Sequence, residues 1–164
     1  MANNKKYMII SGEYSGDIYG SLLIQELKKI NSNSLFWGIG GKNMKEQNVS
    51  MLADMEDLSI IGFTASILKI KKLKQLMRDI CIQIKKINPD HIVLIDFPGF
   101  NLSLAKKIKM SNNIPISFFI SPTVWAWGEK RINHVKKFVD QMLVIFPFEE
   151  KYYKDRGYNK AKFI

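Results

Sequence analysis

The sequence predicts an α/β fold in which a parallel β-sheet carries helices on both faces. Short apolar runs that end in a turn alternate with helical segments along the whole chain, and this alternation is typical of parallel sheets. The 164 residues suffice for one domain with a buried core, and a hydrophobic fraction of 46% is that of a globular protein. No repeat or Pro-rich linker divides the chain. We therefore expect one α/β domain over residues 1–164.

Five apolar runs are the candidate strands of this sheet. The first, YMIIS (7–11), is followed by a glycine, and LFWGIG (35–40) ends in a glycine turn. Strands covered on both faces have such continuous apolar sequences because both sides of the strand are buried. The other three candidates are HIVLID (91–96), ISFFI (116–120) and QMLVIF (141–146).

Helical patterns separate these runs. Apolar residues recur at helical spacing after the first strand, at Tyr19, Leu22, Leu23, Leu27 and Ile30. A long helical pattern then reaches about Ile87, and two shorter segments cover about 101–111 and 128–138. The apolar stripe of the long helix is typical of a helix that packs on a core, and its members are Ile70, Leu73, Leu76, Met77, Ile80, Ile84 and Ile87.

The composition narrows the classes of partner and compartment. The formal net charge is +10, but Arg occurs only at 78, 131 and 156, and Arg is the usual reader of bases and phosphates. We therefore expect no nucleic-acid partner. The only cysteine, Cys81, excludes an internal disulfide and fits a reducing compartment. With no apolar run of 18 residues and too short an apolar start for a signal peptide, a cytoplasmic protein is expected.

Ligands of parallel sheets bind at the carboxyl ends of the strands, which selects the loop SGEYSGD (11–17). Its glycine spacing matches neither the P-loop nor the dinucleotide fingerprint. Ser15 is expected to cap the following helix, with Asp17 in its first turn. Capping does not explain Glu13, a carboxylate at a strand end.

The loop LIDFPGFN (94–101) holds the strongest candidate for catalysis. Asp96 ends an apolar strand between Ile95 and Phe97, and an apolar environment raises the pKa of a carboxyl group, so that it can serve as a general base. The alternative is an aspartate that only stabilises the loop. Asn101 is expected to cap the next helix.

A third feature indicates contact with a membrane. Ile67 and Leu68 fall off the apolar stripe of the long helix, close to Lys71, Lys72 and Lys74. Apolar residues beside lysines at a helix start suit an anionic bilayer surface. A local contact with a loop is the alternative.

Six segments in this order resemble the lipid-A-disaccharide synthase family: GEYSGD, GIGG, MEDLSIIG, IDFPGFN, SPTVWAWGEKRI and PFEEKYY. The resemblance covers essentially the whole chain. Many members carry a second Asp where this chain has Gly99, and Arg-Gln where it has Gly128 and Glu129. The first difference weakens any scheme that needs two acids in that loop, but it leaves Asp96 in place.

The resemblance implies a GT-B glycosyltransferase, which has two Rossmann-like domains with a cleft between them. Residues 1–164 would be the amino-terminal domain, on the acceptor and membrane side, and the carboxyl-terminal UDP-sugar domain would lie outside this chain. The implied substrates are UDP-2,3-diacylglucosamine and 2,3-diacylglucosamine 1-phosphate, joined by an inverting displacement at an anionic inner-membrane surface. The enzyme would be cytoplasmic and peripheral on that membrane.

The same resemblance assigns the site residues. Asp96 would be the base, with Glu13 as the next candidate, and no metal or cofactor is expected. We expect Trp125 to face the cleft and Trp127 the core, with both in the core as the alternative. The substrate-binding candidates are Glu13, Ser15, Gly16, Asp17, Asn101, Ser121, Trp125, Lys130 and Arg131, and the membrane-contact candidates are Ile67, Leu68, Lys71 and Lys74.

Two other functions fit parts of this pattern. One is another UDP-sugar enzyme of the same architecture, such as a UDP-N-acetylglucosamine 2-epimerase. The other is a membrane-binding module without catalytic activity. We expect residues 1–164 alone to be inactive, so analysis of the products of the complete protein would separate the three.

Overall fold

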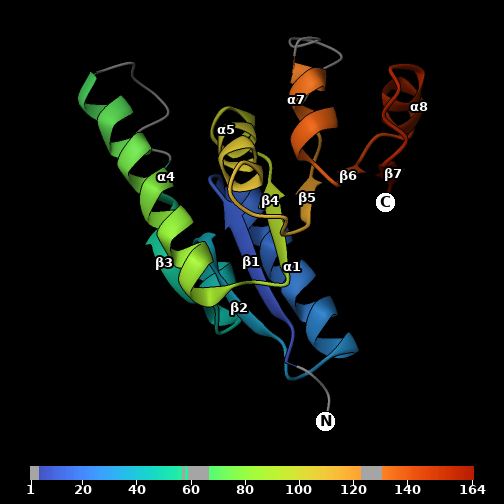
Figure 1. The fold of residues 1–164 in the computed structure, drawn as a ribbon. Helices are drawn as coiled ribbons and strands as arrows, with labels where there is room; N and C mark the ends of the chain where they lie inside the picture. The colour runs from blue at the N-terminus through green and yellow to red at the C-terminus, as the bar shows by residue number, and fades with distance from the viewer. Residues whose placement is uncertain (1–3, 57, 59–66, 123–130) are drawn as a thin grey trace. The chain divides into compact units, whose positions relative to one another are not determined.

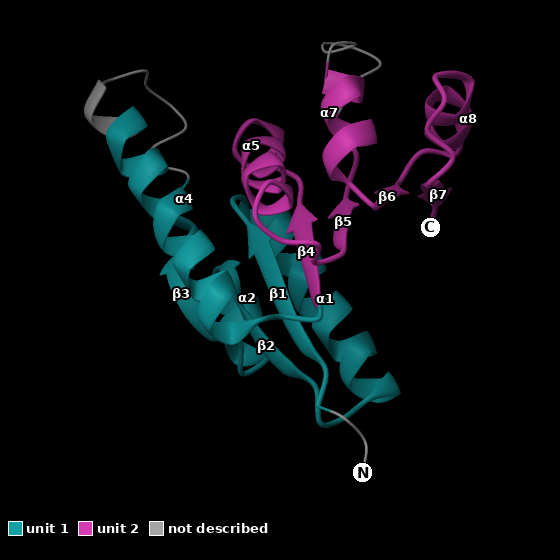
Figure 2. Ribbon diagram, in the orientation of Figure 1, with its two compact units in different colours: residues 1–90 teal, residues 91–164 magenta. Residues whose placement is uncertain are grey.

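The computed structural model of the chain describes residues 4–56, 58, 67–122 and 131–164. The chain forms two compact units, residues 1–90 and residues 91–164 (Figure 2). Each unit contains a parallel sheet and the helices that connect its strands (Figure 1). All five candidate strands are present, and this confirms the α/β class.

The first unit has three parallel strands in the order β3-β2-β1. Gly38 lies opposite Ile9 in the register of β1 and β2, and a Cβ atom at Gly38 would lie 1.9 Å from the carbonyl oxygen of Ile9. Glycine therefore allows the two backbones to approach. The elements are β1 (Lys6–Ser11), α1 (Tyr14–Ile30), β2 (Leu35–Gly40), α2 (Lys42–Glu46), β3 (Ser50–Asp54) and α4 (Ile67–Ile87).

The second unit has four parallel strands in the order β4-β5-β6-β7. Its core is formed by strand residues such as Leu94 and Phe118 together with Tyr153 of a helix, all of them fully buried. The elements are β4 (His91–Ile95), α5 (Pro98–Lys109), β5 (Ile116–Phe119), α7 (Arg131–Phe138), β6 (Gln141–Val144), α8 (Pro147–Asp155) and β7 (Ala161–Phe163).

The buried face of α1 differs from the predicted one. Tyr19 and Leu22 are 41% and 51% exposed, and Ile30 is 83% exposed. The residues that are buried are mostly small, because small side chains let a helix backbone lie close to the strands beneath it: Gly16, Asp17, Gly20, Ser21 and Ile24.

The apolar stripe of α4 is core only in its carboxyl-terminal half. Ile80 and Ile84 are buried, whereas Ile70 is 49% exposed and Leu73 is half-buried. The prediction that the whole stripe is core is thus wrong at Ile70, near the start of α4. The side chains of Ile67 and Leu68 lie outside the described residues.

Candidate active site

Asp96 lies at a strained corner at the carboxyl end of β4. Asp96 and Phe97 both have left-handed backbone conformations, with φ of 48° and 46°. The backbone N–H of Asp96 donates to the carbonyl of Phe119 at 2.9 Å, which ties the corner to the end of β5. Left-handed conformations are costly for residues other than glycine and concentrate at functional sites. The corner therefore holds the carboxylate in a defined place.

The carboxyl group of Asp96 is partly buried. This burial raises the pKa of Asp96, and a hydrogen bond from the backbone N–H of Phe97 opposes the shift in part. The direction agrees with the prediction made from its apolar neighbours. A carboxylate with a raised pKa is a better proton acceptor, as general-base catalysis requires.

Asn101 is fully buried within the first turn and a half of α5. It does not cap that helix, because the helix begins earlier, with Phe97 at the N-cap position and Pro98 as its first residue. The side-chain Nδ2 of Asn101 donates instead to the carbonyls of Ile95 and Asp96, at 3.2 and 2.8 Å. Asn101 and Asp96 are therefore brought together through the backbone of the corner.

Ser121 follows β5 and is 6% exposed. Its hydroxyl forms a 2.8 Å hydrogen bond with the hydroxyl of Tyr153 and donates to the carbonyl of Pro122 at 3.1 Å. Burial raises the pKa of Tyr153, so its phenol stays protonated. The preceding residue, Ile120, has φ of 66°, which is strained for a β-branched side chain. Tyr153 ends the segment PFEEKYY but was not among the predicted site residues.

The start of α1 differs from its prediction. The N-cap residue is Glu13, which is exposed, and no side chain caps the helix. Ser15 is exposed inside the first turn, so its predicted capping role is wrong, and the next residue, Gly16, is buried. Since β1 ends at Ser11, whose hydroxyl donates to the carbonyl of Glu13 at 3.1 Å, Glu13 lies at the carboxyl end of a strand as expected.

Asp17 is fully buried and binds the start of α2. One carboxylate oxygen accepts from the backbone N–H groups of Gly41 and Met44, at 2.7 and 3.1 Å. The other accepts from the backbone and side-chain amides of Asn43, at 3.0 and 2.8 Å. The carboxylate thus satisfies backbone donors at a helix start. It also lines a pocket of about 340 Å³ with Tyr14 and Lys45.

The predicted site residues are divided between the two units. Glu13, Ser15, Gly16 and Asp17 belong to the first unit, and Asp96, Asn101, Ser121 and Arg131 to the second. Arg131 is exposed in the first turn of α7 as the structure describes it. Trp125, Trp127 and Lys130 lie outside the described residues.

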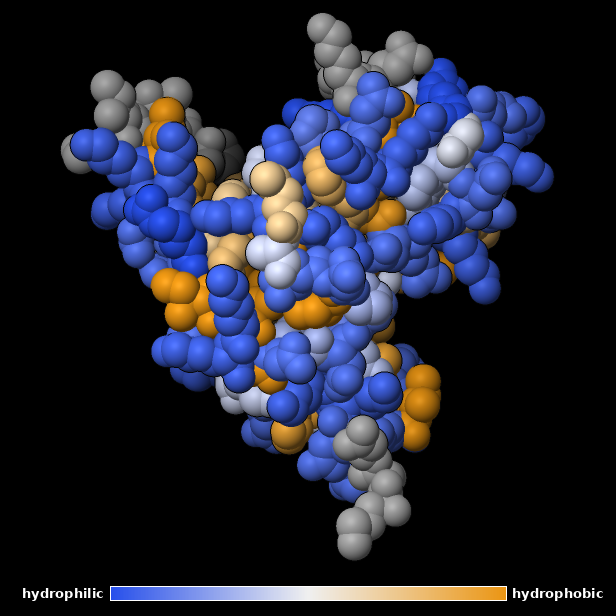
Figure 3. All heavy atoms as spheres, viewed as in Figure 1, coloured by the Kyte–Doolittle hydropathy of each residue, from blue (hydrophilic) through white to orange (hydrophobic). Residues whose placement is uncertain are grey.

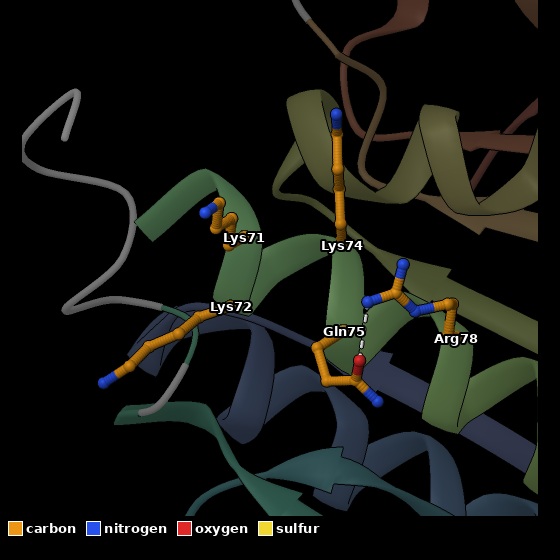
Figure 4. A pocket seen from close by; sticks show the side chains of 5 residues that line it. All are labelled: Lys71, Lys72, Lys74, Gln75 and Arg78. Carbon is orange, nitrogen blue, oxygen red and sulfur yellow. Dashed lines mark hydrogen bonds between the residues drawn. The ribbon is translucent and has the colours of Figure 1, made fainter. Parts of the chain in front are cut away.

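A basic groove runs along α4 (Figure 4). Its volume is about 500 Å³, and its lining is formed by Lys71, Lys72, Lys74, Gln75 and Arg78. Arg78 donates to the side-chain oxygen of Gln75 at 2.6 Å, while the lysines extend from the helix (Figure 4). Figure 3 shows hydrophilic side chains gathered around this part of α4, with apolar atoms beside them.

Two features are absent from the described residues: a group of side chains that could hold a metal ion, and a helix that could cross a membrane. Among residues 4–56, 58, 67–122 and 131–164, no three His, Cys, Asp or Glu side chains are grouped so that they could hold a metal ion. Within the same ranges, no helix combines the length and apolarity that crossing a membrane requires.

A protein-family model described as "Lipid-A-disaccharide synthetase" matches residues 7–164. The chain belongs to this family. Curated relatives named lipid-A-disaccharide synthase include one from Syntrophus aciditrophicus, 39% identical over 94% of this chain, and one from Myxococcus xanthus, 34% identical over 96% of this chain. These matches cover 40% and 41% of the relatives, so the chain spans about two fifths of their length.

Solved structures share the fold of this synthetase-family chain. A UDP-GlcNAc 2-epimerase from Neisseria meningitidis aligns with a TM-score of 0.66 at 11% identity, over 95% of this chain and 44% of its own. A glycosyltransferase from Rickettsia africae aligns with a TM-score of 0.61 at 14% identity, over 99% and 43%. At such identities the likeness shows the fold alone, and it agrees with the predicted Rossmann-like fold.

Proposed function

We propose that the chain is the amino-terminal, acceptor-side domain of an inverting glycosyltransferase of lipid A biosynthesis. The enzyme joins UDP-2,3-diacylglucosamine to 2,3-diacylglucosamine 1-phosphate and releases UDP. Membership of the synthetase family supports the reaction class. The relatives extend beyond the matched part, and we propose that the UDP-sugar binds in a second domain. The residues from 1 to 164 would then need that domain for turnover.

The observation that carries this proposal is the partly buried carboxyl of Asp96 at its strained corner. Asp96 accepts the proton of the acceptor 6-hydroxyl while the hydroxyl oxygen attacks the anomeric carbon of the donor. The bond from that carbon to the UDP oxygen breaks, and the configuration inverts. One base suffices for such a displacement, which fits a loop that holds Asp96 and lacks a second acid at Gly99.

We also propose that the other candidates predicted from the sequence bind substrate. Glu13 is the alternative base, since it lies exposed at the carboxyl end of β1. Trp125 is the proposed aromatic contact, because aromatic faces suit sugar rings and acyl chains. Arg131 is proposed to bind the acceptor phosphate. The full substrate-binding set is Glu13, Ser15, Gly16, Asp17, Asn101, Ser121, Trp125, Lys130 and Arg131.

Product analysis tests the proposal. A two-domain protein that contains this chain is incubated with both acylated sugars, and the products are separated by mass. We expect a disaccharide 1-phosphate and equimolar UDP, without added metal. A change at C2 of a UDP-sugar without disaccharide would favour the epimerase alternative, and vesicle binding without any product would favour the membrane-binding module.

The basic groove on α4 supports a cytoplasmic enzyme that binds the inner-membrane surface peripherally. Lys71, Lys72 and Lys74 are all exposed, and the exposed Ile70 lies among them. Lysines attract anionic headgroups while apolar side chains enter the boundary of the bilayer. Ile67 and Leu68, at the start of the same helix, remain the other proposed membrane contacts. Acylated sugars are drawn from a bilayer, so the location suits the substrates.

Reversing the charge of Lys71 and Lys74 should release the protein from anionic vesicles. Each basic residue near such a surface contributes about 1 kcal/mol, so Lys71→Glu with Lys74→Glu should weaken binding by at least about 10-fold to 100-fold. The melting temperature should not change, because both side chains are exposed. Sedimentation with phosphatidylglycerol vesicles measures the effect.

Lys85 and Lys86 provide the matched control. Both are exposed lysines in the last turn of α4, away from the groove. Reversing their charges should leave vesicle binding much closer to that of the unmodified protein. An equal loss in the two double variants would mean that net charge, and not this groove, attracts the membrane.

A further inference from the structure

We propose that Asn101 is a positioning residue that holds the backbone corner from which the Asp96 carboxylate projects. The inference rests on the proposed function, since it concerns the base of that reaction. It replaces two predicted roles of Asn101, helix capping and substrate binding, with a role that acts through Asp96, because the Asn101 side chain is fully buried.

The first support is the pair of hydrogen bonds from the Asn101 amide. Nδ2 carries two protons, and it lies 2.8 Å from the carbonyl of Asp96 and 3.2 Å from that of Ile95. These are consecutive carbonyls at the point where β4 ends. A single rigid side chain thus fixes both peptide groups that flank the turn into Asp96.

The second support is the conformation that these bonds hold. Asp96 and Phe97 are consecutive left-handed residues, and neither is glycine. Such strain persists only where the surroundings over-determine the backbone. Asn101 is fully buried and supplies two of the contacts that do so, together with the bond from Asp96 N–H to Phe119.

The third support is the remaining oxygen of the amide. Oδ1 of Asn101 is buried, and it has no hydrogen-bond partner among the described residues. Reversing the amide would point this oxygen at two carbonyls, so the orientation with Nδ2 toward the corner is the favourable one. A leucine of similar size would fill the same space without burying an unpaired acceptor. Packing alone therefore does not explain an amide at this position, whereas two carbonyls that need donors do.

The consequence for catalysis is geometric. A base must lie within hydrogen-bond reach of the proton that it removes, and a displacement of about 1 Å can cost about 100-fold in rate. If the corner relaxes, the carboxylate of Asp96 moves relative to the acceptor and gains water. The substrates themselves lose no contact, so binding should change little.

A double-mutant cycle tests the role in a two-domain protein that contains this chain. Asn101→Ala should lower kcat about 10-fold to 100-fold with little change in KM. In an Asp96→Asn background the same change should cost nothing further, because the base that it positions is gone. Additive losses, or a loss confined to KM, would overturn the inference and place Asn101 in structure or in substrate contact.

Ser103→Ala is the matched control. Ser103 lies in the same helix and bonds the carbonyl of Gly99 at 2.9 Å, but its side chain is exposed. This variant removes a bond to the first turn of α5 without touching the corner, so kcat should stay near that of the unmodified enzyme. A loss as large as that of Asn101→Ala would mean that any bond to the start of this helix matters equally.

A second measurement does not depend on turnover. The carboxyl titration of Asp96, followed by 13C NMR in the same protein, should shift to lower pH in Asn101→Ala because the group becomes better solvated. An unchanged titration would overturn the inference even if no disaccharide forms, while a shift without any disaccharide would contradict only the proposed function. If the alanine variant does not fold, Asn101→Ser, which keeps one donor, should show a smaller shift in the same direction, and no shift there would overturn the inference.

Discussion

Asp96→Asn is expected to lower the kcat of the two-domain enzyme by about two to four orders of magnitude, the usual contribution of a general base. Asparagine has nearly the same shape as aspartate but cannot accept the acceptor proton. The loss should fall on kcat, since the variant still offers a polar group to the substrates. Initial rates of UDP release at saturating acceptor measure it.

The same variant should not lose stability. Burial raises the pKa of Asp96 in the folded chain, so the fold favours the protonated carboxyl. That contribution is present at low pH and is lost as the pH rises through the raised pKa. At neutral pH the ionised group opposes folding, and a neutral asparagine should leave the melting temperature unchanged or higher.

Asp155→Asn is the control for this experiment, because Asp155 is an exposed carboxylate of α8 paired with Lys151. Its kcat should match that of the unmodified enzyme. Normal turnover by Asp96→Asn would move the role of base elsewhere, and Glu13→Gln would then be the next variant to examine.

Burial determined how well the strands could be predicted. The five long apolar runs are all strands, because strands covered on both faces have no polar positions to obscure them. Two strands were missed for the opposite reason. β3 has no buried residue, and β7 has only three residues, two of which are exposed. The chain therefore contains strands that a search for apolar runs does not detect.

Helix faces were harder to predict, as α1 shows. Its larger apolar residues suggested the buried face, but Gly16, Gly20 and Ser21 are turned inward. Hydropathy gives small residues little weight, although close backbone packing depends on them. Tyr19, Leu22 and Ile30 are left largely at the surface.

The candidate site shows the same limit. Asp96 could be predicted because a carboxylate that ends an apolar run at the sheet edge is a local signal. The left-handed corner could not, since Asp96 and Phe97 are not glycines. The bonds from Asn101 to Asp96, from Ser121 to Tyr153 and from Gly41 to Asp17 join residues 5, 32 and 24 positions apart. Helix-capping rules consider only the nearest turn.

Asp17→Ala is expected to lower the free energy of unfolding by about 3–5 kcal/mol, among the largest effects of a single substitution. The change removes four hydrogen bonds to a charged acceptor. It also leaves buried backbone donors of Gly41 and Met44 without a partner, and each such group costs about 1–3 kcal/mol. Urea denaturation followed by circular dichroism measures the loss.

Amide hydrogen exchange locates the cause of that loss. If Asp17 holds the start of α2, the N–H groups of Gly41, Asn43 and Met44 should exchange faster in Asp17→Ala, ahead of the amides of β1. Asp79→Ala is the control, because Asp79 is an exposed aspartate of α4 that accepts one bond from Gln75 at 2.9 Å, and it should cost less than about 1 kcal/mol. The loss of unfolding free energy in Asp17→Asn should lie between those of Asp17→Ala and Asp79→Ala. An amide keeps one acceptor oxygen but turns its NH2 group toward the backbone donors. Equal unfolding free energies for Asp17→Ala, Asp17→Asn and Asp79→Ala would show that the four hydrogen bonds to the Asp17 carboxylate contribute little to stability. The packing of small residues on α1 would then be the main stabilising contribution at this end of the sheet.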